Sequence, residues 1–140
     1  MEALLRKLNY KGYSRIIVNN ATCEFMDSLV AALPGVQIDT DIDPRFPYEF
    51  MILFVKHFCE VEALAPRALH NLVTDGILWF AFPKNTSKNL ASDIDSKHGW
   101  EVLIDRGFDK VRQVSIDNDW SALRFRNIRY IRSNNGRFDR

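Results

Sequence analysis

The sequence lacks long apolar runs and any marked excess of one sign of charge. Even its longest apolar runs, such as residues 50–55, are far shorter than the about 20 residues that a membrane-spanning helix needs. The first residues carry an acid where a secretory signal has a basic region, and no sustained apolar segment follows. Nineteen Lys and Arg residues stand against 18 Asp and Glu residues, and a net charge of +1 by itself indicates no polyanionic partner. We therefore expect a cytoplasmic protein without a membrane segment.

Cysteine and histidine are too few and too scattered for the common metal and nucleophile motifs. Cys23 and Cys59 form no Cys-x-x-Cys pair, and His57, His70 and His98 are widely spaced, so no metal site is predicted. The sequence also contains neither the Gly-x-Ser-x-Gly of serine hydrolases nor the Gly-x-x-x-x-Gly-Lys of phosphate loops. Hydrolytic chemistry is therefore not predicted, and we expect each cysteine to be a small core residue.

Length and composition are those of one ordinary globular domain. The chain has 140 residues, of which 46% are hydrophobic and 26% are charged. Residues 1–132 contain no flexible linker and no internal repeat, and we interpret them as one domain. The composition of residues 133–140 is typical of a disordered tail.

Short apolar runs alternate with segments of helical spacing along the chain. The runs predict strands at residues 15–19, 36–39, 50–55, 77–82, 111–116 and 122–126. Helices are predicted at residues 2–8, 22–33 and 61–72, followed by a shorter one that Gly107 ends. This order predicts a three-layer, Rossmann-like α/β fold with a mostly parallel sheet of about six strands and an antiparallel hairpin at its C-terminal edge.

Local patterns make further predictions about the helices. In the second helix, Cys23, Met26, Val30 and Leu33 recur at helical steps and are expected to face the core. Pro66 is interpreted as a first-turn proline of the third helix or as a kink.

Two further predictions concern the turn after the third helix and the buried side of the last helix. Asp75 and Gly76 predict a turn between the third helix and the strand at residues 77–82. The last helix is expected to bury Trp100, Leu103 and Ile104.

Ligands of open α/β sheets bind beyond the carboxyl ends of the strands, where the winding reverses. The residues predicted there are Asn19, Asn20, Lys56 and His57, with Lys84 on the neighbouring strand. Two amides and two bases can hold a small anionic molecule, and His57 can titrate near neutrality. The alternative is that Asn20 is a turn residue, Lys56 is solvated and His57 lies at the start of the next helix. The sequence favours this alternative.

The loop after the fourth predicted strand is a second candidate anion site. Lys84, Thr86, Ser87 and Lys88 place two ammonium groups and two hydroxyls on a loop that leads toward a helix. The simpler interpretation, which we favour, is a polar loop with a capping serine.

Arginines alternate with apolar residues near the C-terminus, which places Arg124 and Arg126 on one face of a strand. With Arg129 and Arg132 this face can contact phosphates, as a nucleic-acid binder would require. Arginines also protect an edge strand against pairing with another sheet. The sequence favours edge protection or a protein contact over nucleic acid.

The predicted layout resembles that of class I methyltransferases, which use S-adenosylmethionine, and the segment LVTDGIL at residues 72–78 resembles the turn before their fifth strand. A single helix between the first and third strands makes the chain similar to a shortened version of that fold. It is also similar to a family of small, uncharacterised bacterial domains with the truncated fold, through Ile77, Leu78, Trp79, Pro83, Lys84, the loop at residues 86–88 and WSALRF at residues 120–125. That resemblance implies a fold and no reaction.

One departure from the methyltransferases bears on the cofactor. Their turn after the first strand is rich in glycine, because the cofactor lies against the backbone, whereas residues 18–23 read VNNATC. An acid that could hold a ribose is present about 20 residues further on, as Asp39. The resemblance implies S-adenosylmethionine binding through Asn19, Asn20 and Asp39, and the missing glycines favour a solvated carboxylate instead.

We therefore expect a non-catalytic binding or regulatory module with no cofactor, whose partner is a small anionic molecule or a protein. The alternatives are a divergent S-adenosylmethionine-dependent methyltransferase and a nucleic-acid binder that uses the arginine-rich C-terminus.

Overall fold

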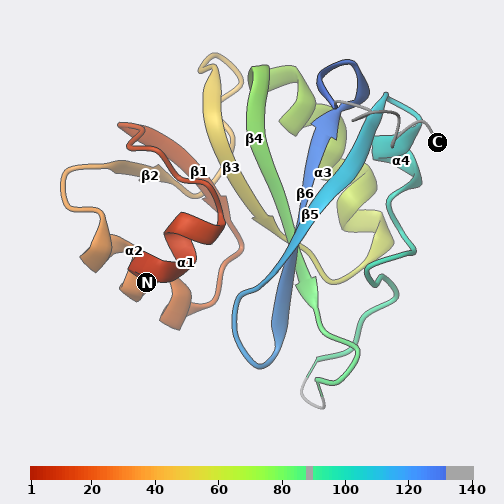
Figure 1. Ribbon diagram of the computed structural model, residues 1–140, viewed down its shortest axis with the longest axis horizontal. Coiled ribbons are helices and arrows are strands. Elements are labelled where there is room, and N and C mark those ends of the chain that lie inside the picture. The colour runs from red at the N-terminus through yellow and green to blue at the C-terminus, as the bar shows by residue number, and fades with distance from the viewer. Residues whose placement is uncertain (88–89, 132–140) are drawn as a thin grey trace.

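The computed structural model describes residues 1–87 and 90–131. Its six strands form one sheet in the order β2-β1-β3-β4-β6-β5 (Figure 1). The strands are β1 (Arg15–Asn19), β2 (Gln37–Asp39), β3 (Tyr48–Phe54), β4 (Leu72–Pro83), β5 (Phe108–Ser115) and β6 (Trp120–Asn127). β1 to β4 pair in parallel, and β6 is antiparallel to both β4 and β5. The predicted α/β fold with its C-terminal antiparallel hairpin is confirmed.

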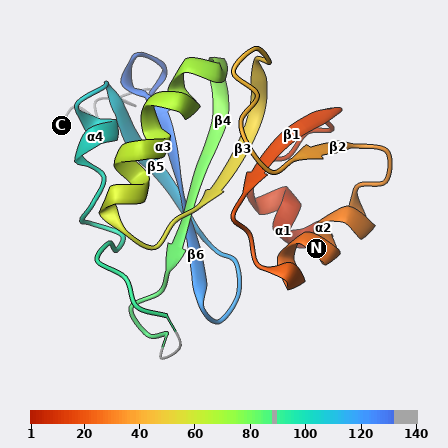
Figure 2. The same ribbon diagram turned by 180° about the vertical axis from the view of Figure 1, so that it is seen from behind.

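The helices lie on both faces of the sheet. α1 (Glu2–Lys7) and α2 (Cys23–Ala32) cover one face, and α3 (Phe58–Asn71) and α4 (Glu101–Ile104) cover the other (Figures 1 and 2). A short 3-10 helix, η1 (Ile128–Tyr130), follows β6. No helix among residues 1–87 and 90–131 is long and apolar enough to cross a membrane.

Alternation along the strands explains the three layers. In β3, Met51 and Leu53 point to the α3 face, and Phe50 and Ile52 point to the face under α1 and α2. All four are fully buried, so β3 is apolar on both faces, as a central parallel strand must be.

The N-terminal helix is held to its layer by a buried hydrogen bond. The indole N–H of Trp79 in β4 donates to the backbone oxygen of Leu8 over 2.9 Å. Because a buried indole N–H needs a partner, this bond fixes where the chain leaves α1.

The expected core stripe of α2 is confirmed only in part, because Met26 and Leu33 pack against the core while Cys23 and Val30 do not. Phe25 and Leu29 are the buried residues, whereas Val30 is 55% exposed and Cys23 is exposed. Burying Phe25 and Leu29 removes more apolar area from water than burying Cys23 and Val30. This larger gain sets the rotation of the helix.

Two related expectations fail for the other helices. Cys59 lies on the exposed side of α3, so neither cysteine is a core residue. In α4, Leu103 and the adjoining Trp100 are buried, but Ile104 is 49% exposed because the helix ends there after one turn.

Pro66 lies well inside α3 rather than in its first turn. The helix begins earlier than predicted, because the Glu60 carboxylate accepts hydrogen bonds from the backbone N–H groups of Lys56 (2.6 Å) and His57 (2.9 Å). These bonds satisfy backbone donors before the first turn, so the helix starts at Phe58.

The predicted turn at Asp75 and Gly76 is a bulge inside β4. Tyr48 of β3 pairs with Leu72, and Phe50 then pairs with Ile77, so β4 carries extra residues at this point. Asp75 has a φ of 56°, the left-handed conformation that aspartate tolerates better than most residues. The strand therefore begins at Leu72, five residues earlier than expected.

Candidate functional site

β1 ends at Asn19, and Asn20 follows it, at the predicted site. The Asn19 side-chain amide donates to the backbone oxygen of Thr40 over 2.9 Å, which ties the end of β1 to the loop after β2. The other amide atom, Oδ1, is enclosed and has no hydrogen-bond partner within the described residues. Asn20 has a φ of 58°, a conformation that glycine adopts without strain, but here a side chain is present.

Asp39 lies at the end of β2 with its carboxylate fully engaged. It accepts hydrogen bonds from the Tyr48 hydroxyl (2.5 Å), Arg15 Nε (2.8 Å) and the Gln37 amide (3.0 Å). Its Cα is paired with that of Ile17, which packs in the core cluster on the α3 face. The expected solvated loop carboxylate is therefore wrong: Asp39 is the centre of a polar cluster, and its side chain is 15% exposed.

The electrostatics of this cluster keep Asp39 ionised. Partial burial raises its pKa, but hydrogen bonds from Tyr48, Gln37 and Arg15 lower it, and the resulting pKa is below the ordinary value for aspartate. The Arg15 guanidinium also lies 4.1 Å from the ring centre of Phe46, so it is held from a second side.

Lys56 and His57 follow β3, as predicted, but they act mainly at the start of α3. Their backbone N–H groups are bound by Glu60, and Asp93 accepts a hydrogen bond from the Phe58 N–H over 2.7 Å. His57 Nδ1 lies 3.8 Å from Asp93 Oδ1. The favoured interpretation of His57 as a helix-start residue is confirmed.

The loop after β4 binds the β5–β6 hairpin. Lys84 Nζ donates to Ser115 Oγ over 2.8 Å, and the Ser87 hydroxyl donates to Asp119 over 2.9 Å. Thr86 is exposed, and Lys88 lies outside the described residues. Lys84 and Ser87 therefore hold the loop after β4 to the β5–β6 hairpin.

Of the predicted site residues, the structure brings Asn20 and Lys56 to one cavity. It has a volume of about 380 Å³ and lies beyond the carboxyl ends of β1 and β3. Its lining residues are Asn20, Thr22, Phe54, Lys56, Glu60, Leu90 and Trp120.

The arrangement does not fit S-adenosylmethionine. The one acid at the end of β2 that could hold a ribose is bound by Tyr48, Arg15 and Gln37. The free oxygen of Asn19 is too enclosed to receive a donor from a ligand. A nucleoside at this end would have to displace contacts that the chain makes with itself.

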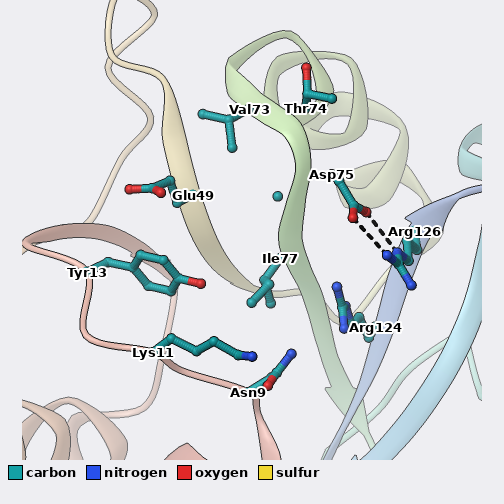
Figure 3. A pocket seen from close by; sticks show the side chains of 11 residues that line it. Asn9, Lys11, Tyr13, Glu49, Val73, Thr74, Asp75, Ile77, Arg124 and Arg126 are labelled. Carbon is teal, nitrogen blue, oxygen red and sulfur yellow. Dashed lines mark hydrogen bonds and ion pairs between the residues drawn. The ribbon is translucent and has the colours of Figure 1, made fainter. Parts of the chain in front are cut away.

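A second cavity, of about 410 Å³, lies at the opposite end of the strands, where β3 and β4 begin. Sequence reasoning missed it, because its lining comes from segments far apart in the chain. Figure 3 shows the side chains of Asn9, Lys11 and Tyr13, from the α1–β1 connection, facing those of β4 and β6 across the cavity. The one available signal was the alternation that places Arg124 and Arg126 on one face, and both do line this cavity.

The two arginines of β6 have different surroundings. Arg126 forms a bidentate ion pair with Asp75, with both N–O distances at 2.8 Å. Arg124 makes no hydrogen bond or ion pair within residues 1–87 and 90–131, and its Nε is buried. The interpretation of this strand as a protected edge is wrong, because β6 has β4 and β5 as neighbours and β5 is the edge strand. Arg132 and the predicted tail at residues 133–140 lie outside the described residues.

The chain is similar in structure to several methyltransferases. A SAM dependent methyltransferase from Aquifex aeolicus is 10% identical, with a TM-score of 0.61 over 90% of this chain and 88% of that chain. The N-methyltransferase NodS from Bradyrhizobium japonicum WM9 is 10% identical, with a TM-score of 0.59 over 89% of this chain and 93% of that chain. NodS in complex with S-adenosyl-l-homocysteine is 11% identical, with a TM-score of 0.57 over 90% of this chain and 84% of that chain.

The sequence matches no family model and no curated protein. Identities of 10–11% carry information about architecture and not about activity. The similarity agrees with the strand order, with its parallel half and antiparallel hairpin. The chain therefore has the α/β fold of the class I S-adenosylmethionine-dependent methyltransferases.

Proposed function

We propose that this chain is a non-catalytic binding module, which retains a methyltransferase fold but has internal contacts in place of the cofactor. The observation that carries the proposal is the engagement of Asp39 by Tyr48, Arg15 and Gln37. An acid that held a ribose would have to turn its oxygens toward the ligand. Here both oxygens are already hydrogen-bonded, and leaving the buried Tyr48 hydroxyl unsatisfied costs free energy.

The link between Asn19 and Thr40 supports the same proposal. It joins the two loops between which a cofactor of this fold would enter, and a side chain occupies the left-handed position at Asn20. Binding S-adenosylmethionine would require the loop after β2 to move away from β1. The proposal therefore predicts that neither the cofactor nor its demethylated product binds.

Thermal unfolding with S-adenosylmethionine and S-adenosylhomocysteine tests this directly. A ligand at 100 times its dissociation constant stabilises a fold by about 2.7 kcal/mol, which corresponds to several degrees in melting temperature for a domain of this size. We expect no shift at millimolar concentrations of either compound. A shift of several degrees that disappears in Asn19→Ala would overturn the proposal.

A divergent methyltransferase is the second candidate function. The observation that favours it is the cavity of about 380 Å³ beyond the ends of β1 and β3, which Asn20 and Lys56 line. This candidate predicts methyl transfer from labelled cofactor to some component of a cell lysate. It also predicts that Asn19→Ala abolishes the transfer while Lys97→Ala, a change at an exposed loop residue, does not.

A further inference from the structure

The cavity where β3 and β4 begin contains Arg124, a cation with no ion pair among the described residues. Arg124 lies in β6 between two other strands, with its Nε atom buried. Burial is the largest influence on its pKa and lowers it, and repulsion from Arg126 lowers it further. Arg124 as a whole is half-buried, and a charge that is partly removed from water normally has a counter-ion, because the loss of hydration is costly. The charge of Asp75 raises the pKa of Arg124 from a distance, but no group in residues 1–87 and 90–131 forms an ion pair or a hydrogen bond with Arg124.

Neither of the acids that line the cavity forms an ion pair with this arginine. Asp75 is bound at both oxygens by Arg126. Glu49 is exposed, and its carboxylate points away from Arg124 in Figure 3. Within the described residues, the positive charge of Arg124 at this cavity therefore has no ion-paired acid.

Other groups at the same cavity are donors that suit an anion. Lys11 is exposed and extends its amino group toward the cavity beside the Asn9 side chain (Figure 3). Tyr13 adds a hydroxyl from the same side of the cavity as Lys11. Arginine matches the geometry of a carboxylate or phosphate with two parallel hydrogen bonds, and lysine and tyrosine can complete the shell.

We propose that this cavity binds a small molecule through an oxyanion, either a carboxylate or a phosphate group, that pairs with Arg124 and Lys11. A volume of about 410 Å³ lies in the range of small-molecule pockets, so the ligand is of metabolite size rather than a bare ion. The inference rests on the proposed binding function and gives it a place and a ligand class. The site lies at the opposite end of the strands from Asp39.

Titration with simple anions, followed by NMR, tests the site. Inorganic phosphate and acetate are added separately to the full chain, with ionic strength held constant by sodium chloride. We expect saturable shifts at the Arg124 side-chain N–H and at the backbone amides of Lys11 and Gly76. Shifts with both anions indicate a general oxyanion site, and shifts with one alone identify its chemistry. No saturable shift with either anion overturns the proposal.

Matched variants locate the binding. Arg124→Gln is expected to weaken the binding of the effective anion about tenfold or more, and Lys11→Gln about threefold. Lys97→Gln, at an exposed lysine outside the cavity lining, is expected to leave it unchanged. If Arg124→Gln does not fold, Lys11→Gln still tests the site. Lys11 is exposed on the α1–β1 connection, so its substitution leaves the fold intact. Equal binding by Lys11→Gln and Lys97→Gln would contradict the assignment.

The outcomes separate this inference from the proposed function. Failure of the anion titration, with no thermal shift by S-adenosylmethionine, removes the site and leaves the non-catalytic module standing. Cofactor binding with saturable shifts at Arg124 removes the proposed function and leaves the anion site.

Discussion

Asp75 and Arg126 bind each other through both carboxylate oxygens and two guanidinium nitrogens, across the start of β4 and the end of β6. The pair joins the bulge of β4 to the antiparallel strand beside it. Arg126 thereby binds both carboxylate oxygens of Asp75, the acid of β4. The consequence is that Arg124, two residues earlier on the same face, has no acid of its own.

Arg126→Gln is expected to raise the pKa of Asp75. Hydrogen bonding from Arg126 is the largest influence on that pKa and lowers it below the ordinary value. A lowered pKa stabilises the fold above the unfolded value of about 3.9, and this contribution is lost as the pH falls through the folded value. Because the side chains are 33% and 32% exposed, the loss of stability at pH 7 is below about 1 kcal/mol.

The Asp75 titration can be followed through its carboxyl carbon by NMR. Arg129→Gln is the control, because Arg129 is not among the groups that shift Asp75. An unchanged Asp75 pKa in Arg126→Gln would show that the pair does not persist in solution.

Tyr48→Phe is expected to destabilise the fold by about 1–3 kcal/mol at pH 7, because it removes a donor to Asp39 and an acceptor for the Asp43 N–H. The pKa of Asp39 is lowered, so the contribution of this carboxylate is present above about pH 3.9 and disappears as the pH falls through its folded pKa. The difference from wild type should therefore shrink at pH 3.

Urea unfolding at pH 7 and pH 3 measures this difference. Tyr130→Phe is a suitable control, since the Tyr130 hydroxyl makes no hydrogen bond within the described residues. The same loss at both pH values would mean that Tyr48 does not act through ionised Asp39.

Gly99→Ala is expected to be much more damaging than Gly107→Ala. Both glycines have positive φ, 103° and 84°, so each substitution carries backbone strain of about 1–2 kcal/mol. At Gly99 the new Cβ would also lie 2.2 Å from Cγ2 of the buried Ile94, whereas at Gly107 nothing lies within 4 Å. Overpacking adds about 1–3 kcal/mol at Gly99 alone. Equal melting temperatures for the two variants would contradict the packing of Ile94.

Both thiols of the native protein are expected to react with a disulfide reagent without denaturant. Cys23 and Cys59 are exposed at the first turns of α2 and α3. Exposed thiols react through their thiolate fraction and need no unfolding step. Absorbance during labelling gives the rate, and Cys59→Ser leaves the other thiol to be measured alone. Labelling that requires urea would contradict the positions of both helices.

The order of the elements was predictable because it depends on local patterns. The apolar run at residues 50–55 identifies the central strand, and each helix follows from spacing and end signals. The rotation of α2 about its axis was not predictable. Phe25 and Val30 both suit a helix, and only the sheet beneath decides which one is buried. The bulge at Asp75 was mistaken for a turn, since a left-handed residue serves either purpose.

The candidate site was harder to predict than the fold. Asn20 and Lys56 do share a cavity, because the carboxyl ends of neighbouring parallel strands meet at one edge. The engagement of Asp39 depends on Tyr48 and Arg15, whose contacts cross strands and leave no local pattern. The cavity beside Arg124 requires the α1–β1 connection to pass the start of β4, and only tertiary structure reveals that.

The bulge at the start of β4 separates two hollows of the molecule. Residues 73–76 line the cavity beside Arg124 and also a hollow of about 280 Å³ on the α3 side, bounded by Leu69, Phe108 and Tyr130. The backbone of residues 73–76 thus lies between the two hollows. A substitution at any of these four residues would therefore alter the lining of both hollows at once.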